Sequence, residues 1–190
     1  MRGWWFVPCL VSLGGCGLLG DPGELVGEMT VQATLEENSC GGAFGTIPTT
    51  SEIDVQLYER SGKLTWIGSQ GTFQADIDED GNFVFRTYGS QQLRPAEPDG
   101  YGDVLAACVV ESVEEIRGTL VRRVVPAADG GTAEAGDEGD EAVAASVSAT
   151  DTLQVAAAAG ADCRDFVGLG GSSFQALPCR MVLQLEGSEE

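Results

Sequence analysis

Hydrophobic and polar residues alternate with a period of two along much of the chain, which is the pattern of strands that bury one face. The alternation is clearest in residues 28–36, 52–57 and 72–77. Glycine-containing turns at residues 61–62 and 80–81 each precede a further apolar stretch. Strands of this length joined by such short turns predict an antiparallel meander.

The second half of the chain continues the pattern. Residues 105–125 are rich in β-forming side chains, with an expected interruption at 111–115, and residues 179–186 alternate again close to the end. We expect this last strand to pair with the earlier sheet. About eight strands predict an all-β domain, as a small barrel or a two-sheet sandwich. The barrel is preferred because successive hairpins join most strands, and its outline is similar to that of lipocalin-like barrels.

Four segments interrupt the strand pattern. Residues 126–150 contain six acidic side chains, no basic one and no aromatic one, so we predict a disordered acidic insertion. Residues 89–103 and 168–178 are rich in polar residues, glycine and proline, and predict loops in which binding specificity would lie. Residues 162–167 predict a single helical turn. The domain as a whole is expected to span residues 28–190.

The amino-terminal end has the order of a secretory signal. Arg2 is followed by an apolar stretch over residues 4–13 and then by small residues. The run Leu13, Gly14, Gly15, Cys16 resembles the lipobox of bacterial lipoprotein precursors. This resemblance implies that residues 1–15 are a cleaved signal peptide and that Cys16 carries the lipid.

The same resemblance implies where the protein is located. More than one acyl chain at Cys16 would anchor the protein to a membrane without a spanning segment. In the family an Asp after the lipidated cysteine retains the protein at the inner membrane, and Gly17 stands there instead. We therefore expect the outer membrane, with the domain facing the periplasm or the cell surface. Residues 16–27 are predicted to form a flexible tether.

Four further cysteines remain in the exported domain, and an even number in an exported chain predicts two disulfides. Three connectivities are possible. We favour Cys163 with Cys179 and Cys40 with Cys108, because the first closes a loop of about 15 residues and constrains the unfolded chain by about 3 kcal/mol. A zinc site is disfavoured because the chain has no CxxC spacing and no histidine.

Charge and composition exclude several classes of function. The chain has 30 Asp and Glu against 10 Lys and Arg, a formal net charge of -20. Nucleic acids are bound by clustered basic side chains, so we expect no nucleic-acid partner. The absence of histidine removes the commonest general base and every Ser-His or Cys-His nucleophile pair. We expect a protein that is not an enzyme and uses no cofactor.

One motif resembles the opening of a calcium-binding loop. Asp76, Asp78 and Asp80 alternate ahead of Gly81, as carboxylates do in such loops. The twelfth position is Thr87 rather than a bidentate Glu. A hairpin turn explains the same residues, and calcium is the weaker interpretation.

These observations favour a non-catalytic envelope lipoprotein, monomeric, with a structural or protein-interaction role. The alternative is a module that binds a small apolar or carbohydrate ligand in or beside a barrel. An enzyme that uses paired carboxylates is the third hypothesis. A filled interior would favour the first, and a cavity the second. The aromatic residues of the predicted strands indicate a filled core: Trp66, Phe73, Phe83 and Phe85.

Overall fold

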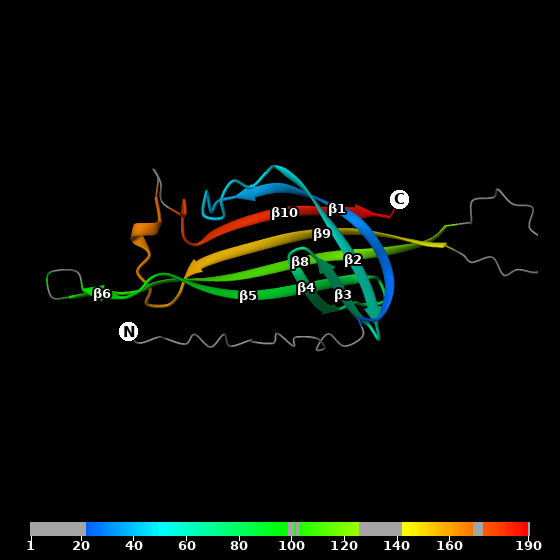
Figure 1. Cartoon of the computed structure of the whole chain (residues 1–190), viewed down its shortest axis with the longest axis horizontal. Helices are drawn as coiled ribbons and strands as arrows, with labels where there is room; N and C mark the ends of the chain where they lie inside the picture. Colours follow the sequence, from blue (N-terminus) through cyan, green and yellow to red (C-terminus); the bar gives the residue numbers. More distant parts are fainter. Residues whose placement is uncertain (1–21, 99–100, 102, 126–141, 169–172, 190) are drawn as a thin grey trace, which may run out of the picture.

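The protein is an all-β domain built around one antiparallel sheet (Figure 1). The computed structural model describes residues 22–98, 101, 103–125, 142–168 and 173–189. Eight strands form the main sheet: β1 Glu24–Asn38, β2 Thr50–Arg60, β3 Lys63–Gly68, β4 Gly71–Asp76, β5 Asn82–Arg94, β8 Cys108–Val125, β9 Ala142–Ala157 and β10 Cys179–Ser188. The short strands β6 Glu97–Pro98 and β7 Val104–Leu105 pair separately, and the 3-10 turn η1 spans Arg164–Phe166.

The sheet curls until its first and last strands meet, so that it is nearly closed into a barrel. Its order is β4-β3-β2-β1-β10-β9-β8-β5, with every pair antiparallel. The ring is joined by a bridge between Ile77 and Phe83, beyond which β4 and β5 diverge. The predicted all-β antiparallel fold is therefore confirmed, in its barrel-like form rather than as a sandwich.

The predicted alternation places the core correctly. In β1, Met29, Val31 and Ala33 are buried, while the residues between them are exposed. The last strand, β10, pairs with β1 from Val31 to Asn38 and so returns to the earlier sheet as expected. The predicted helical turn is also present, as η1.

Several predicted boundaries are wrong. Strand β1 begins at Glu24, inside the expected tether, and β8 continues through residues 111–115 without interruption. The expected loop at 89–103 begins as the second half of β5. Strand β9 occupies residues 142–150, which were predicted to be disordered, and residues 126–141 of that insertion lie outside the described part. Pairing on both sides explains β9, because tertiary context overrides the weak strand propensity of alanine and serine.

The centre of the barrel is filled by aromatic side chains. Trp66 and Phe73 each lie 6.2 Å from Phe85, and Phe83 lies 5.1 Å from it, measured between ring centroids. Aliphatic side chains from β1, β2, β8, β9 and β10 surround the rings. The predicted core role of these four aromatic residues is confirmed. A second apolar cluster forms around the disulfides, at the opposite end of the long strands.

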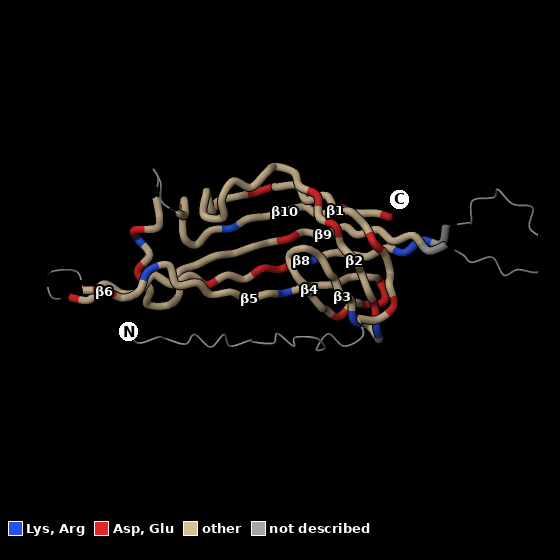
Figure 2. Tube along the Cα trace, in the orientation of Figure 1, with Lys and Arg blue, Asp and Glu red and all other residues tan. Residues whose placement is uncertain are grey.

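Polar contacts close the barrel at its filled end. The Glu189 side chain follows the end of β10 and accepts hydrogen bonds from the amides of Glu28 in β1 and Ala145 in β9, at 3.0 and 2.8 Å. Arg122 of β8 pairs with Glu59 of β2. Figure 2 shows Asp and Glu spread over the strands, with Lys and Arg as separate points among them. Within the described ranges, no helix is long and apolar enough to cross a bilayer.

Candidate functional site

The strand register divides the inner face of the sheet into rows of residues that lie side by side. One row contains Phe85, Ile116, Asp151 and Leu183. The next row toward the disulfides contains Thr87, Glu114, Leu153 and Met181, and the row beyond it contains Gly89, Ser112, Val155 and Cys179. Two carboxylates therefore lie on a face that is otherwise mostly apolar. They separate the aromatic core from the disulfide cluster.

Asp151 is the more deeply buried of the two carboxylates. It is 8% exposed, and its Oδ1 has no hydrogen-bond partner among the described residues. Burial raises the pKa of Asp151, and the negative charge of Glu114 raises it further, to about 7. A carboxyl group with this pKa exchanges its proton near neutral pH, whereas an ordinary aspartate is fully ionised there.

Glu114 is held by a neighbouring strand. The Thr87 hydroxyl on β5 donates a hydrogen bond of 2.9 Å to Glu114 Oε2 on β8. Glu114 and Asp151 are diagonal neighbours on the paired strands β8 and β9, a relationship that brings long side chains within reach of one another. Among the described residues, no Lys or Arg forms an ion pair with either carboxylate.

A pocket of about 240 Å³ lies beside the row that contains Thr87 and Glu114, on the side of the disulfides. It is lined mainly by apolar and small side chains: Phe44, Gly89, Ser90, Gln91, Val110, Ser112, Val155 and Phe174. The rings of Phe44 and Phe174 meet edge to face at 6.2 Å. At the other end, a Cβ atom on Gly89 would come within 2.6 Å of the Ser112 hydroxyl, so glycine keeps this part of the pocket open.

Two disulfides belong to the same apolar cluster as Val110, Val155 and Phe174 of the pocket, and their connectivity differs from the one we favoured. Cys40 is bonded to Cys179, and Cys108 is bonded to Cys163. The prediction of Cys163 with Cys179 and Cys40 with Cys108 is therefore wrong. Each bond links the end of one strand to the start of its antiparallel neighbour, because Cys40 follows β1 and Cys179 begins β10. Which cysteines are bonded therefore depends on which strands are neighbours in the sheet, and not on the length of the loop that a disulfide closes.

The segment that carries Cys163 is fixed by charged side chains. Arg164 donates two hydrogen bonds to the Asp162 carboxylate, at 2.9 and 2.6 Å, and Arg94 of β5 donates one of 2.8 Å to the Asp162 carbonyl oxygen. The pairing with Arg164 lowers the pKa of Asp162 to about 2. These contacts connect the turn η1 to β5 and keep Cys163 beside β8.

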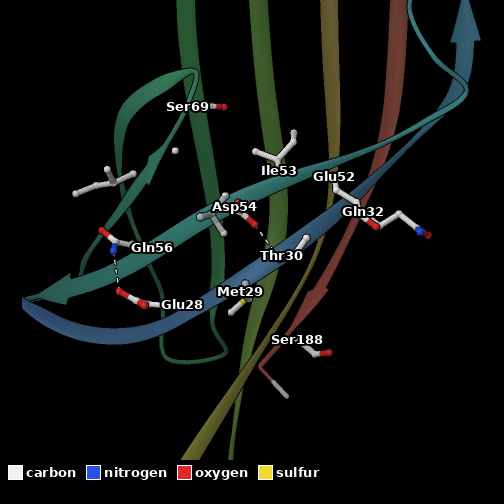
Figure 3. A pocket seen from close by; sticks show the side chains of 13 residues that line it. Glu28, Met29, Thr30, Gln32, Glu52, Ile53, Asp54, Gln56, Ser69 and Ser188 are labelled. Carbon is white, nitrogen blue, oxygen red and sulfur yellow. Dashed lines mark hydrogen bonds between the residues drawn. The ribbon is translucent and has the colours of Figure 1, made fainter.

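A larger hollow lies elsewhere, over the β1–β2 pair (Figure 3). It has a volume of about 1130 Å³ and opens widely to solvent. Four of its polar side chains are engaged in two pairs, since Gln56 donates to Glu28 at 2.7 Å and Thr30 donates to Asp54 at 2.8 Å. Figure 3 shows these two pairs side by side along the strands. We assign no chemistry to this hollow.

The three aspartates of the candidate calcium loop do not converge. Asp76 pairs with Lys63, while Asp78 accepts hydrogen bonds from the amides of Asp80 and Asn82. The hydrogen bonds from Asn82 are the main reason that the pKa of Asp78 is lowered. The residues form the hairpin turn between β4 and β5, and the part of the chain that is described holds no group of three side chains suited to a metal.

Sequence reasoning missed Glu114 and Asp151. Asp151 continues an inward series of small and apolar residues that includes Val147, Ala149 and Val155. The sequence pattern that could have identified it is therefore a single carboxylate at an inward position of a strand. That signal was hidden because residues 126–150 were assigned to a disordered insertion. Glu114 was hidden by the expected interruption at 111–115. The predicted lipidation site, Cys16, lies outside the described residues.

The fold and the pocket define a class of protein: a small, disulfide-linked antiparallel barrel with carboxylates on its inner face. Comparison with protein-family models, curated proteins and solved structures gave no match to this chain. The function is therefore argued from the chemistry of the chain itself.

Proposed function

We propose that the protein is a non-catalytic envelope lipoprotein, anchored to the outer membrane through Cys16, whose β domain contacts another envelope protein. The anchoring part rests on the leader and its resemblance to a lipobox, in which Cys16 follows Leu13, Gly14 and Gly15. Two disulfides in the described domain are consistent with export to an oxidising compartment.

The open edge of β5 is the observation that supports an interaction role. Strand β5 pairs with β8 from Asn82 to Arg94, but among the described residues the bridge between Ile77 and Phe83 is the only pairing on its other side. An unpaired strand edge can accept an added strand from a partner. Tyr88 lies on this edge strand and is 76% exposed, opposite Val113 of β8.

The alternative of a ligand in the barrel centre has less support. Trp66, Phe73, Phe83 and Phe85 fill that space with ring contacts. A small pocket remains at the disulfide end. An enzymatic role would need carboxylates at a cleft that admits a substrate, and the deeper carboxylate, Asp151, is almost fully buried.

Anchoring is tested by growing cells with a tagged fatty acid and comparing the wild type with Cys16→Ser. We expect label on the wild type only, and release of the variant from the membrane fraction. An unlabelled, soluble wild-type protein would contradict the anchor.

The interaction role is tested separately, with a photo-crosslinking amino acid at position 88 in living cells. We expect a crosslinked product that contains a second envelope protein. The same group at Thr152, on a strand paired on both sides, is the control and should give none. A product of twice the mass would indicate self-association instead, and no product from position 88 would argue against the β5 edge.

A further inference from the structure

The open edge of β5 and the small apolar pocket meet at the same residues. Gly89, Ser90 and Gln91 line the pocket, and all three lie where β5 pairs only with β8 among the described residues. Each of them is exposed, and so are their neighbours Tyr88 and Gln92. A strand with one buried face exposes only every second residue. The described part of the chain therefore leaves both faces of β5 uncovered along this stretch.

The backbone of β5 shows which residues would pair with an added strand. The Asn82 carbonyl accepts a hydrogen bond of 3.1 Å from the Asp78 amide, on the side away from β8. Successive residues of an antiparallel strand direct their backbone groups to opposite sides, and the register with β8 is continuous over this stretch. Tyr88 and Ser90 therefore direct their amides and carbonyls to the open side, while those of Gly89 face β8.

A strand added at this edge would place a side chain directly beside Gly89. The residue opposite Gly89 would belong to a pair that exchanges no backbone hydrogen bonds, and in such pairs the Cα atoms are only about 4.5 Å apart. Its side chain would point to the inner face, as the buried Phe83 and Phe85 of β5 do. Because Gly89 has no side chain, the path toward Ser112 is free. A Cβ atom on Gly89 would come within 2.6 Å of the Ser112 hydroxyl and narrow that path.

The walls of the pocket favour an aromatic side chain. They include Val110, Val155 and the rings of Phe44 and Phe174. Aromatic rings prefer edge and offset contacts with one another, and a third ring would add to the pair already present. An apolar cavity of about 150 Å³ is enough for benzene, so a volume of about 240 Å³ has room for a phenyl ring. Phe44 is 45% exposed, and such a ring would shield it from water.

Charge restricts the partner further. The chain has a formal net charge of -20, whereas residues 88–92 contain no Asp, Glu, Lys or Arg. A second copy of the chain would bring the same negative charge against this edge, and like charges repel. An uncharged or basic segment meets no such repulsion.

We propose that the partner at the β5 edge supplies an extended, uncharged or basic segment that pairs antiparallel with β5 and inserts an aromatic side chain into the pocket beside Gly89. This inference rests on the proposed function, because it states the chemistry of the partner that the edge would bind. Backbone hydrogen bonds to Tyr88 and Ser90 would provide affinity for any extended chain. The pocket would provide specificity for one side chain, which is how strand addition is made selective.

Two blocked heptapeptides serve as probes of the full chain with its disulfides intact. One has phenylalanine at its centre, two threonines on each side and a lysine at each end, and the other has alanine at the centre. In calorimetric titrations we expect the phenylalanine peptide to bind about tenfold more tightly, or better, because only this peptide buries a ring.

The outcomes separate the pocket from the edge. Equal binding of the two peptides would overturn the role of the pocket and leave an interaction at the β5 edge intact. Binding of neither peptide at millimolar concentration would also overturn the inference. The proposed function is judged independently, by the crosslink from position 88 in cells.

A variant closes the pocket without removing the backbone groups that face the partner. Gly89→Val should weaken binding of the phenylalanine peptide by about tenfold and leave binding of the alanine peptide unchanged. Gln92→Val, at an exposed outward position of the same strand, is the matched control and should keep the preference for phenylalanine. A Gly89→Val protein that retains this preference would contradict the pocket.

Hydrogen exchange on the wild type tests strand addition without any variant. At saturation, the phenylalanine peptide should slow exchange of the Tyr88 and Ser90 amides by about tenfold or more, because these amides gain acceptors. The Gly89 amide faces β8 and should change little. Binding that leaves the Tyr88 and Ser90 amides unprotected would show a ring in the pocket without an added strand, and would refute the proposed pairing.

Discussion

The carboxylates of Asp151 and Glu114 share one interior, on diagonal positions of β9 and β8, and the charge of Glu114 adds to the effect of burial on the pKa of Asp151. Each would be ordinary alone on a surface. Together on an inner face, they make the region between the two apolar clusters sensitive to protonation. The pH dependence of the stability of the domain is expected to follow from this pair.

Asp151 should make the domain less stable as the pH rises. The folded protein binds the Asp151 proton up to about pH 7, whereas the unfolded chain releases it near the ordinary value of 3.8. Between these values the folded state binds more protons, so the free energy of unfolding falls as the pH increases and then levels off. Glu114 is the charged neighbour, while Ile116 and Leu183, across from Asp151, are uncharged.

Replacing Asp151 by Asn should remove the fall in the free energy of unfolding that occurs as the pH rises. At pH 8 we expect the variant to be more stable than the wild type by on the order of 2–4 kcal/mol, with a smaller difference of about 1–2 kcal/mol at pH 5 and little difference below pH 4. Urea unfolding at the two pH values measures the effect. Asp54→Asn, at an exposed position of β2, is the control and should keep the pH dependence of the wild type. A variant that is less stable than the wild type at pH 8 would refute the assignment.

The disulfide connectivity can be read directly. Proteolysis without reduction should yield peptides that link Cys40 to Cys179 and Cys108 to Cys163. The first bond closes 139 residues and the second 55, so the chain-entropy model gives about 5 and about 4 kcal/mol for their removal. Paired Cys→Ser variants should therefore unfold at lower denaturant, the first pair earlier. A peptide joining Cys163 to Cys179 would contradict the structure.

Gly118 should not tolerate a side chain. A Cβ atom there would lie 2.4 Å from the Ala149 Cβ and 2.6 Å from the Ser148 carbonyl oxygen. Because β9 cannot retreat between two paired neighbours, Gly118→Ala should cost about 1–3 kcal/mol in thermal or urea unfolding. Gly42→Ala, where a Cβ would meet nothing within 4 Å, is the matched control. Equal stability of the two variants would show that β8 and β9 are farther apart than described.

Glu189 should stabilise the barrel although it follows the last strand. Its carboxylate accepts hydrogen bonds from the amides of Glu28 and Ala145, which lie on two different strands. Glu189→Ala removes both acceptors and should cost about 1–3 kcal/mol. Glu189→Gln keeps one acceptor oxygen and should lie between the wild type and the Ala variant. Hydrogen exchange at the two amides locates the change, and unaltered protection in Glu189→Ala would argue against the contact.

The sequence was sufficient for the strands that carry a strong alternation. Strand β1 is predicted by the inward series Met29, Val31 and Ala33. The alternation after Cys179 predicts β10, which returns to pair with β1. It was insufficient for β9, because alanine and serine have little preference for strands. There the fold is imposed by β8 and β10 on either side, and information of that kind is not local to the segment.

The candidate site depended on the part of the fold that the sequence did not reveal. Unless β9 is predicted as a strand, Asp151 cannot be assigned to the inner face of the sheet. Its diagonal position next to Glu114 then cannot be predicted either. The disulfide pairs were missed for the same reason, since Cys108 and Cys163 adjoin only when β8 and β9 are known to pair. The sequence shows how many acidic residues and cysteines there are. Which of them are neighbours in space can be predicted only when the register of the strands is known.

The first described strand, β1, lies in the middle of the sheet, between β2 and β10. A force on the amino-terminal end of the domain would therefore load the β1–β2 and β1–β10 hydrogen bonds together in shear. An edge strand would instead separate by breaking one hydrogen bond after another. If those ladders yielded, the load would pass through Cys40 to Cys179, which is a covalent link. The fold is therefore suited to withstand a force applied at Glu24, where β1 begins.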